Sequence, residues 1–334
     1  MENEVLAQLN GKRLFLTGGT GFFGKSFLEF IGTYKKSKSL DLDLVILTRN
    51  SSAFIEKNSG LYDPSWISFH EGDIQNFPFP KAKFDHILHF ATPADATWNV
   101  THPIEMFDTI VNGTRRVLEF AAQSKVKSVL FASSGAVYGK QPSDCTHIPE
   151  KYPGAPDLTQ ANSSYGEGKR VAEYLGNIYS RKHGFDFKIA RCFAFAGPHL
   201  DPDAHYAIGN FIRDAVAGKP LTIQGDGTPH RSFLYSDDLV TWLIKILLDG
   251  KNSTPYNVGS DQELSIKELA AKIIKVLSLS NEIVIKGEPI AGKPVERYVP
   301  SIELAKKELG LKVYTSLDDS IKLTAAAFTK KLGI

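Results

Sequence analysis

The sequence predicts an α/β protein in which a doubly wound parallel sheet is followed by a smaller C-terminal lobe. Along the first half of the 334-residue chain, short apolar runs alternate with amphipathic stretches, which is the pattern of repeated βαβ units. A glycine-rich turn directly follows the first apolar run. After Gly197-Pro198 the alternation stops and shorter, mixed elements begin. The first two observations indicate the parallel sheet, and the third places the start of the lobe.

Each element is predicted from its own pattern. Apolar runs predict strands at residues 13–17, 44–48, 67–71, 86–90, 128–132 and 187–192, and helical periodicity predicts helices at 22–34, 103–123 and 164–183. The last of these helices is followed by Gly184, a typical stop signal. Further on we expect a helix near 210–217 and a strand at 221–223. We therefore expect a first domain at 1–195 and a lobe mainly at 196–334, with some segments returning to the first domain.

Composition disfavours several classes of protein. The hydrophobic fraction of 42% and the charged fraction of 23% are ordinary for a globular protein. The formal net charge of +2, without long runs of like charge, disfavours nucleic acid as a partner. No apolar stretch approaches the roughly 18 residues that a membrane span needs. With only two cysteines and scattered histidines, we expect no disulfide framework and no metal site. A cytoplasmic protein without a membrane partner is the expectation.

The glycine turn carries the first functional prediction. Glycines let the backbone approach a pyrophosphate closely, and a helix N-terminus offers N–H groups and the positive end of a dipole. The turn lies between the first predicted strand and the first predicted helix, so it predicts a Rossmann-type site for NAD(P). The residues expected to contact the cofactor there are Gly18, Thr20, Gly21, Phe22, Phe23 and Gly24. The alternative is an ordinary glycine-rich turn without a ligand.

The ends of the next two strands bear on the choice of cofactor. Leu47-Thr48-Arg49-Asn50 has no acid to accept from a ribose 2′-hydroxyl, whereas Arg49 suits a 2′-phosphate. We therefore favour NADP slightly over NAD, the alternative being that Arg49 is solvated and NAD still binds. Asp73, which Ile74 follows, comes after the third strand and is a candidate either to accept from the adenine amine or to cap a helix.

A serine, a tyrosine and a lysine form the candidate catalytic group. Tyr165 and Lys169 are four residues apart and so share one face of a helix. A nearby ammonium lowers the pKa of a phenol from its usual value of about 10, which makes the tyrosine a usable base near neutral pH. Ser134 follows the fifth strand, at the edge where open α/β sheets bind ligands. The alternative role of Ser134 is to shape a turn.

Together these motifs resemble the extended short-chain dehydrogenases/reductases, in particular the nucleotide-sugar epimerase/dehydratase family. The resemblance covers nearly the whole chain, through residues 17–24, 112–114, 133–139, 165–169, 191–198 and 225–238. Within the family, His89-Phe90-Ala91-Thr92-Pro93-Ala94 and residues 167–173 are most similar to UDP-glucuronate decarboxylases.

The resemblance implies an enzyme that binds NAD(P) and a nucleotide-diphosphate sugar. It implies that Ser134 orients the sugar, that Tyr165 exchanges the hydroxyl proton during hydride transfer at sugar C4, and that Lys169 holds the nicotinamide ribose. It adds cofactor contacts at Phe90, Ala91 and Thr92. On the substrate side it implies Thr92, Ser134, Tyr165, Arg231 and Arg297, with Asn210 as a candidate because Ala194 stands where the family has an asparagine. A homodimer through helices 103–123 and 164–183 is also implied.

The departures from the family pattern bear on the reaction. Gly135-Ala136 stand where the family's dehydratases carry Asp-Glu and its decarboxylases a glutamate. Neither residue can move a proton, so the main hypothesis is an epimerase or a 4-keto reductase. The alternative is a 4,6-dehydratase or decarboxylase with a rearranged acid and base. A non-catalytic NADP-binding sensor is an alternative of a different class, which the retained serine, tyrosine and lysine disfavour.

Overall fold

The computed structural model describes residues 2–93, 95–204, 206–290, 292 and 294–333. The chain divides into two compact units. Unit 1 comprises Met1–Gly139, Ala155–Arg191 and Val240–Tyr256, and unit 2 comprises Lys140–Gly154, Cys192–Leu239 and Asn257–Ile334. The chain therefore passes from one unit to the other after residues 139, 154, 191, 239 and 256.

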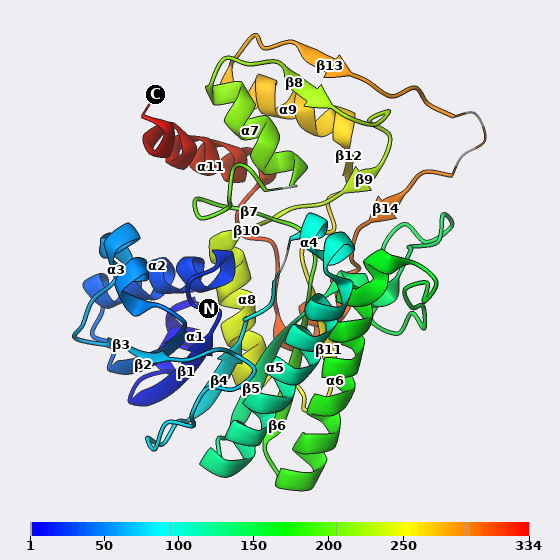
Figure 1. Ribbon diagram of the computed structural model, residues 1–334. Helices are drawn as coiled ribbons and strands as arrows, with labels where there is room; N and C mark the ends of the chain where they lie inside the picture. The colour runs from blue at the N-terminus through cyan, green and yellow to red at the C-terminus, as the bar shows by residue number, and fades with distance from the viewer. Residues whose placement is uncertain (1, 94, 205, 291, 293, 334) are drawn as a thin grey trace. The chain divides into compact units, whose positions relative to one another are not determined.

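A seven-stranded sheet, most of which belongs to unit 1, confirms the predicted α/β fold (Figure 1). In spatial order its strands are β11 (Pro255–Val258), β6 (Asp186–Cys192), β5 (Ser128–Ser134), β4 (His86–His89), β1 (Lys12–Thr17), β2 (Leu42–Thr48) and β3 (Ile67–Glu71). The β1–β2, β1–β4, β2–β3 and β4–β5 pairs are parallel. The chain thus starts in the middle of the sheet and builds outward in both directions, as a doubly wound fold does.

All six strands predicted in the first domain are present. β5 runs two residues further than predicted and ends at Ser134, whereas β4 ends at His89, one residue early. Every residue of β4 and of β5 is buried. Such continuous burial is typical of parallel sheets that helices cover on both faces.

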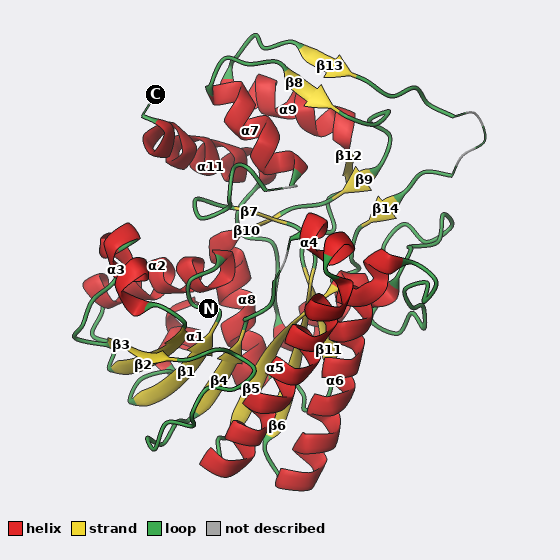
Figure 2. Ribbon diagram, viewed as in Figure 1, coloured by secondary structure: helices red, strands yellow, loops and turns green. Residues whose placement is uncertain are grey.

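Helices pack around this sheet, as the secondary-structure colouring shows (Figure 2). Those of unit 1 are α1 (Glu2–Ala7), α2 (Phe22–Ser37), α3 (Ser51–Lys57), α4 (Ala96–Thr101), α5 (Pro103–Ser124) and α6 (Ser164–His183), with the 3₁₀ turns η1 (Ser59–Leu61), η2 (Gly135–Tyr138) and η3 (Ala161–Ser163). A further helix, α8 (Ser236–Asp249), lies mostly in unit 1. The three helices predicted in this region are confirmed, and α6 ends at His183, just before Gly184, which has a φ of 78°. α5 and α6 pack side by side.

Unit 2 contains short strands and three larger helices. Its elements are β7 (Phe195–Ala196), α7 (Ala207–Val216), β8 (Leu221–Ile223), β9 (His230–Arg231), β10 (Leu234–Tyr235), β12 (Leu264–Ser265), α9 (Ile266–Leu277), β13 (Ile283–Ile285), β14 (Arg297–Tyr298), α10 (Glu303–Leu309) and α11 (Leu317–Leu332). The predicted helix and strand of this region correspond to α7 and β8. α7, α9 and α11 pack against one another. Among the described residues no helix is long and apolar enough to cross a membrane.

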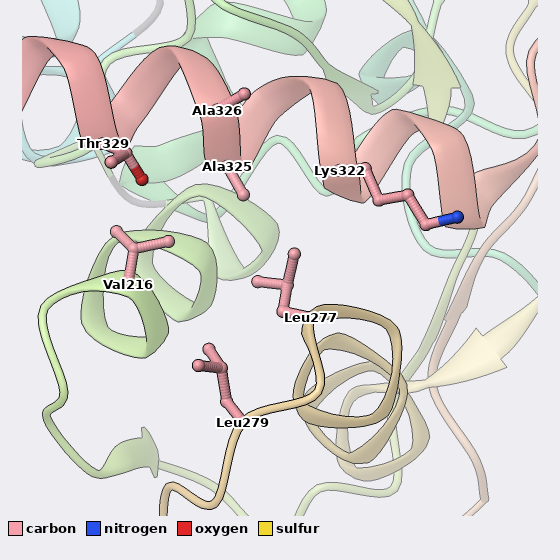
Figure 3. Close-up of a pocket in the computed structure, with 7 residues that line it drawn as sticks. All are labelled: Val216, Leu277, Leu279, Lys322, Ala325, Ala326 and Thr329. Atoms are coloured by element: carbon pink, nitrogen blue, oxygen red, sulfur yellow. The ribbon is translucent and has the colours of Figure 1, made fainter.

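An open pocket of about 310 Å³ lies between these three helices (Figure 3). Its lining is mostly apolar and consists of Val216, Leu277, Leu279, Lys322, Ala325, Ala326 and Thr329. None of the predicted site residues is among them, so this pocket is not the candidate active site.

Candidate active site

The C-terminal ends of β1, β4 and β5 adjoin one another in unit 1. The strand register pairs Thr17 with His89, and His89 with Phe131. The glycine turn after β1, residues 90–92 after β4 and Ser134 at the end of β5 therefore all lie at the same edge of the sheet. This is the edge where parallel α/β sheets bind ligands.

The glycine turn is built for close backbone packing. Gly18 has a φ of +73°, and a Cβ there would lie 2.6 Å from the backbone nitrogen of Ala91. A Cβ on Gly24 would clash with the backbone of Gly19. Gly21 is the N-cap of α2, which receives no side-chain cap from the described residues, and a Cβ on Gly21 would meet the Gly18 carbonyl oxygen at an ordinary contact distance of 3.5 Å. The turn thus fits a pyrophosphate at the start of a 16-residue helix.

The other residues predicted for this turn surround it. Thr20 is exposed, and Phe22 and Phe23 are half-buried. The ring of Phe23 lies 5.8 Å from that of Phe22 and 6.0 Å from that of Phe90, both in edge-to-face geometry. Phe90, which follows β4, is therefore part of the same aromatic group.

A buried histidine ties β1 to β4 below the turn. His89 Nδ1 lies 2.7 Å from the Thr17 hydroxyl, and Nε2 lies 3.1 Å from the Thr114 hydroxyl on α5. The Thr17 hydroxyl also accepts from the Ala91 N–H at 3.2 Å. Burial, helped by the charge of Lys169, lowers the pKa of His89 to about 3. His89 is therefore neutral and holds the segment that faces the glycine turn.

The residues predicted to choose the cofactor follow β2 and β3. Arg49 is exposed and makes no hydrogen bond or ion pair within the described part of the chain. An acid is nevertheless close by, because β3 ends at Glu71, whose Oε1 accepts from the Ser51 N–H at 3.1 Å and from its hydroxyl at 2.7 Å. These bonds lower the pKa of Glu71.

Asp73 and Ile74 shape the turn that follows β3. The Asp73 carboxylate accepts from the Gln75 N–H at 3.0 Å, so it caps a turn rather than the helix that was one of its two predicted roles. Ile74 packs on Gly113 of α5, where a Cβ would meet its side chain at 3.0 Å.

Tyr165 and Lys169 lie on the first two turns of α6. Lys169 is only 2% exposed, and its ammonium donates to the Thr92 hydroxyl and to the Ala132 carbonyl, both at 2.7 Å. The same nitrogen lies 5.8 Å from the centre of the Tyr165 ring. A buried ammonium needs such acceptors, since an unpaired charge is costly inside a protein. The structure thus brings together Thr92, Tyr165 and Lys169.

Ser134 is 7% exposed and stands where β5 meets η2. Its hydroxyl oxygen accepts from the Ala136 N–H at 3.1 Å, so it shapes the turn. A hydroxyl can also donate its one hydrogen, so accepting this bond is compatible with donation to a ligand. η2 contains Gly135, Ala136, Val137 and Tyr138, and hence no carboxylate.

A buried ion pair holds the residue that precedes Ser134 and η2. The Ser133 hydroxyl donates to Glu173 Oε1 at 2.6 Å, and Arg191 binds both oxygens of that carboxylate, at 3.0 and 2.7 Å. The Arg191 guanidinium also lies 4.8 Å from the Tyr138 ring centre. Burial opposes its charge, but the bonds and charge of Glu173 outweigh burial and raise the pKa of Arg191.

The contact of Asn99 with the start of α6 was not predicted. Asn99 on α4 accepts from the Tyr165 N–H at 3.0 Å and donates to the Asn162 carbonyl at 2.7 Å. The pairing spans 66 positions of sequence, and no motif marks Asn99.

The predicted substrate residues Asn210, Arg231 and Arg297 belong to unit 2. The Asn210 side-chain oxygen is buried and has no hydrogen-bond partner among the described residues, although a buried polar atom normally has one. Arg231 pairs with Glu296 at 2.9 Å, and Arg297 pairs with Glu263 at 3.2 Å. Both arginines are therefore partly engaged within unit 2.

Comparison with sequences of known proteins assigns the family. Residues 14–259 match the model of the NAD dependent epimerase/dehydratase family. UDP-glucuronic acid decarboxylase 5 of Arabidopsis thaliana is 30% identical over 100% of this chain and 94% of its own length. UDP-glucuronic acid decarboxylase 1 of Xenopus tropicalis is 29% identical over 98% of this chain and 75% of its own length.

Solved structures share the fold. The UDP-glucose 4-epimerase of Thermotoga maritima superposes with a TM-score of 0.81 at 23% identity and covers 96% of this chain and 99% of its own. A dTDP-glucose 4,6-dehydratase of Streptomyces venezuelae gives 0.80 at 24% identity and covers 96% and 98%. Because the family match spans most of the chain, the protein belongs to the NAD dependent epimerase/dehydratase family and is an enzyme of that family.

Proposed function

We propose that this enzyme converts a nucleotide-diphosphate sugar by a reaction that begins with oxidation at sugar C4. The observation that carries the proposal is the pair formed by Tyr165 and Lys169 at the ligand-binding edge of the sheet. The ammonium of Lys169 is fixed by two acceptors and lies 5.8 Å from the phenol ring. A fixed positive charge at this distance favours the phenolate, which is the form that can accept a proton from a sugar hydroxyl.

Each side chain has a separate task in this step. Bound NAD(P) supplies the acceptor and later the donor of the hydride. Tyr165 takes the proton of the C4 hydroxyl while the C4–H bond is broken, and it returns that proton when a C4 ketone is reduced. Lys169 stabilises the phenolate, and Ser134 donates its hydroxyl hydrogen to the C4 oxygen. The tight packing of Gly18 against Ala91 positions the cofactor-binding turn beside them.

Decarboxylation of UDP-glucuronate is the reaction that the relatives favour over the predicted epimerisation or reduction, since a decarboxylase is 30% identical over the whole chain. The chemistry tolerates the lack of a carboxylate in η2. Oxidation at C4 of a uronic acid produces a β-keto acid. Its C5–C6 bond can break with the electron pair moving to the C4 carbonyl, so that CO₂ leaves without a further base. The resulting enolate then takes a proton from solvent water at C5 and becomes a C4 ketone, which is reduced as described above.

Epimerisation or 4-keto reduction is the second candidate, and the observation that favours it is η2 itself. Gly135 and Ala136 cannot donate or accept a side-chain proton. An enzyme that only moves a hydride and the tyrosine proton needs nothing more at these positions.

One experiment separates these reactions. The purified enzyme is incubated with UDP-glucuronate or UDP-glucose and with NAD⁺ or NADP⁺, and with the reduced cofactors for 4-keto sugars, and products are identified by mass spectrometry and NMR. Loss of CO₂ supports decarboxylation, unchanged mass with inverted C4 supports epimerisation, and a gain of two hydrogens supports reduction. If neither the wild-type enzyme nor Tyr165→Phe converts any of these nucleotide sugars, the proposed function is wrong.

The cofactor is NAD(P), and we propose a preference for NADP. The exposed guanidinium of Arg49, which follows β2 and has no hydrogen-bond or ion-pair partner among the described residues, supports it. The ionised carboxylate of Glu71 at the neighbouring strand end opposes a 2′-phosphate, although Ser51 engages one of its oxygens.

We also propose a homodimer formed through α5 and α6. These helices pack side by side and leave large apolar side chains exposed, namely Ile104 at 71%, Tyr174 at 65% and Ile178 at 40%. A second copy that presents the same surface would cover them. Light scattering should give twice the mass of the chain, and Ile178→Glu should give the monomer.

A further inference from the structure

The helix that carries Tyr165 and Lys169 does not cap itself. Ser163, at the N-cap position of α6, has helical backbone angles and makes no capping bond. Its hydroxyl instead donates to the Asp157 carbonyl at 2.6 Å. The first N–H groups of any helix lack partners within the helix, so another group must satisfy them. The start of α6 is therefore a point where a neighbouring element can control the helix.

Asn99 supplies the missing cap from α4. Its side-chain oxygen accepts from the Tyr165 N–H at 3.0 Å, and its side-chain nitrogen donates to the Asn162 carbonyl at 2.7 Å. The two bonds fix the orientation of the amide, since one partner is a donor and the other an acceptor. α4 is itself held at its start, where Asp95 accepts from the Trp98 N–H at 2.8 Å. Asn99 thus joins a capped element to the first turn of α6.

The other residue of the catalytic pair, Lys169, is held by Thr92, which lies shortly before α4 in the sequence. Thr92 accepts from the Lys169 ammonium at 2.7 Å and donates to the Ala91 carbonyl at 2.8 Å. Tyr165 and Lys169 therefore have separate anchors: Asn99 holds the backbone of the tyrosine, and Thr92 with Ala132 holds the ammonium of the lysine.

We propose that Asn99 is a positioning residue that keeps the Tyr165 phenol within reach of the Lys169 charge. Without Asn99 the first turn of α6 loses a cap and frays. Tyr165 lies in that turn and moves, whereas Lys169 lies one turn later and stays fixed by its two acceptors. The phenolate then loses part of its electrostatic stabilisation. The importance of this for turnover rests on the proposed function, but the positioning itself does not.

The test is a pH titration of Tyr165 that needs no substrate. Phenolate absorbance is recorded for the wild type and for Tyr165→Phe, and the difference isolates this tyrosine. The same difference is taken between Asn99→Leu and the double variant that also carries Tyr165→Phe. If the distance between the Tyr165 phenol and the Lys169 ammonium widens by one or two ångströms, the midpoint of the Tyr165 titration rises by roughly half a pH unit at an effective dielectric constant of about 20. Asn99→Ala, which removes the same bonds without adding volume, is measured in parallel.

A matched control separates positioning from a general loss of stability. Asn10 accepts from the Asp41 N–H at 2.8 Å at the opposite edge of the sheet. Asn10→Ala should lower the melting temperature without moving the Tyr165 midpoint. Other charged groups on the adjoining elements stay unchanged in all variants, namely Asp95 and His102 at the ends of α4, Glu105 and Asp108 on α5, and Glu167 and Arg170 on α6.

Two outcomes decide the matter. A midpoint that rises in both Asn99 variants and not in Asn10→Ala supports the proposal. A wild-type midpoint in either Asn99 variant, with the helical circular dichroism intact, overturns it. If the wild type turns over none of the nucleotide sugars, the proposed function fails, yet the titration still tests Asn99.

Discussion

The ammonium nitrogen of Lys169 lies 2.7 Å from the hydroxyl oxygen of Thr92. The two residues are 77 positions apart, and the contact joins α6 to the segment that follows β4. A lysine that is 2% exposed keeps its charge only because acceptors such as this one replace water. The contact therefore bears on both the stability of unit 1 and the chemistry of the site.

Thr92→Val should show both effects. Valine keeps the shape of threonine but cannot accept from the ammonium, and a hydrogen bond to a charged group is worth about 1.5–3 kcal/mol. We expect the free energy of unfolding, measured by urea denaturation, to fall by about that amount. The acid limb of the kcat profile should move to higher pH, because a less well-held ammonium favours the phenolate less. Thr92→Ser retains the hydroxyl and should restore both; a serine variant as impaired as valine would contradict this assignment.

Tyr165→Phe should remove the proton acceptor with little change in binding. Proton transfer by a positioned side chain contributes typically 10²–10⁴-fold to a rate, so kcat should fall by about that range. The dissociation constant for UDP, measured by calorimetry, should stay close to the wild-type value. Turnover at the wild-type rate in this variant would refute the role of Tyr165.

The buried histidine makes stability depend on pH. The pKa of His89 is about 3 in the folded protein, against 6.5 for the unperturbed group. The unfolded chain therefore binds the additional proton between these values, and the free energy of unfolding falls as the pH drops below 6.5. The loss from this one residue approaches about 1.4 kcal/mol per pH unit.

The check on this prediction is urea unfolding at pH 7, 6 and 5 for the wild type and for His89→Gln. Glutamine can hydrogen-bond to the Thr17 and Thr114 hydroxyls but does not titrate. The free energy of unfolding of the His89→Gln variant should therefore vary less with pH than that of the wild type. His86, whose pKa burial lowers to about 4, remains in both proteins and supplies the residual slope. Identical slopes would show that His89 titrates normally in the folded state.

Substitution of Arg49 should show whether the enzyme prefers NADP to NAD. If the guanidinium binds a 2′-phosphate, Arg49→Ala should raise the dissociation constant for NADPH about tenfold or more and leave that for NADH nearly unchanged. Glu71→Gln should act in the opposite sense, because it removes a negative charge that repels the phosphate. Fluorescence titration of both cofactors measures these constants. Equal effects of Arg49→Ala on the two cofactors would argue for a purely structural role.

Local patterns in the sequence were sufficient to predict six of the seven strands of the central sheet. β1, β2 and β5 are short apolar runs next to turn signals, and each was predicted within two residues of its observed bounds. The glycine turn was found for the same reason, because Gly18, Gly21 and Gly24 lie within seven consecutive residues whose conformations depend on one another. Tyr165 and Lys169 share one helix, so their proximity follows from helical geometry alone.

Contacts between distant segments were beyond such reasoning. Asn99 is one of many polar residues in an undistinguished stretch, and only the packing of α4 beside η3 brings it to Tyr165. The sequence does not indicate the ion pair of Glu173 and Arg191 either, since glutamate and arginine are both common at the surface and nothing marks these two as partners. β11 was also missed, because a four-residue strand that contains Asn257 carries too short an apolar signal to stand out.

The repeated crossing of the chain between its two units restricts how the protein is made and how it can be divided. β6 is complete at residue 192, but its neighbour β11 begins only at residue 255. During synthesis the outer edge of β6 therefore stays unpaired until more than sixty further residues have been added. An unpaired strand edge can form hydrogen bonds with other chains and so promote aggregation. Neither unit is one continuous stretch of sequence. A single proteolytic cut cannot release either unit intact, and a chimera that exchanges one of them needs several junctions.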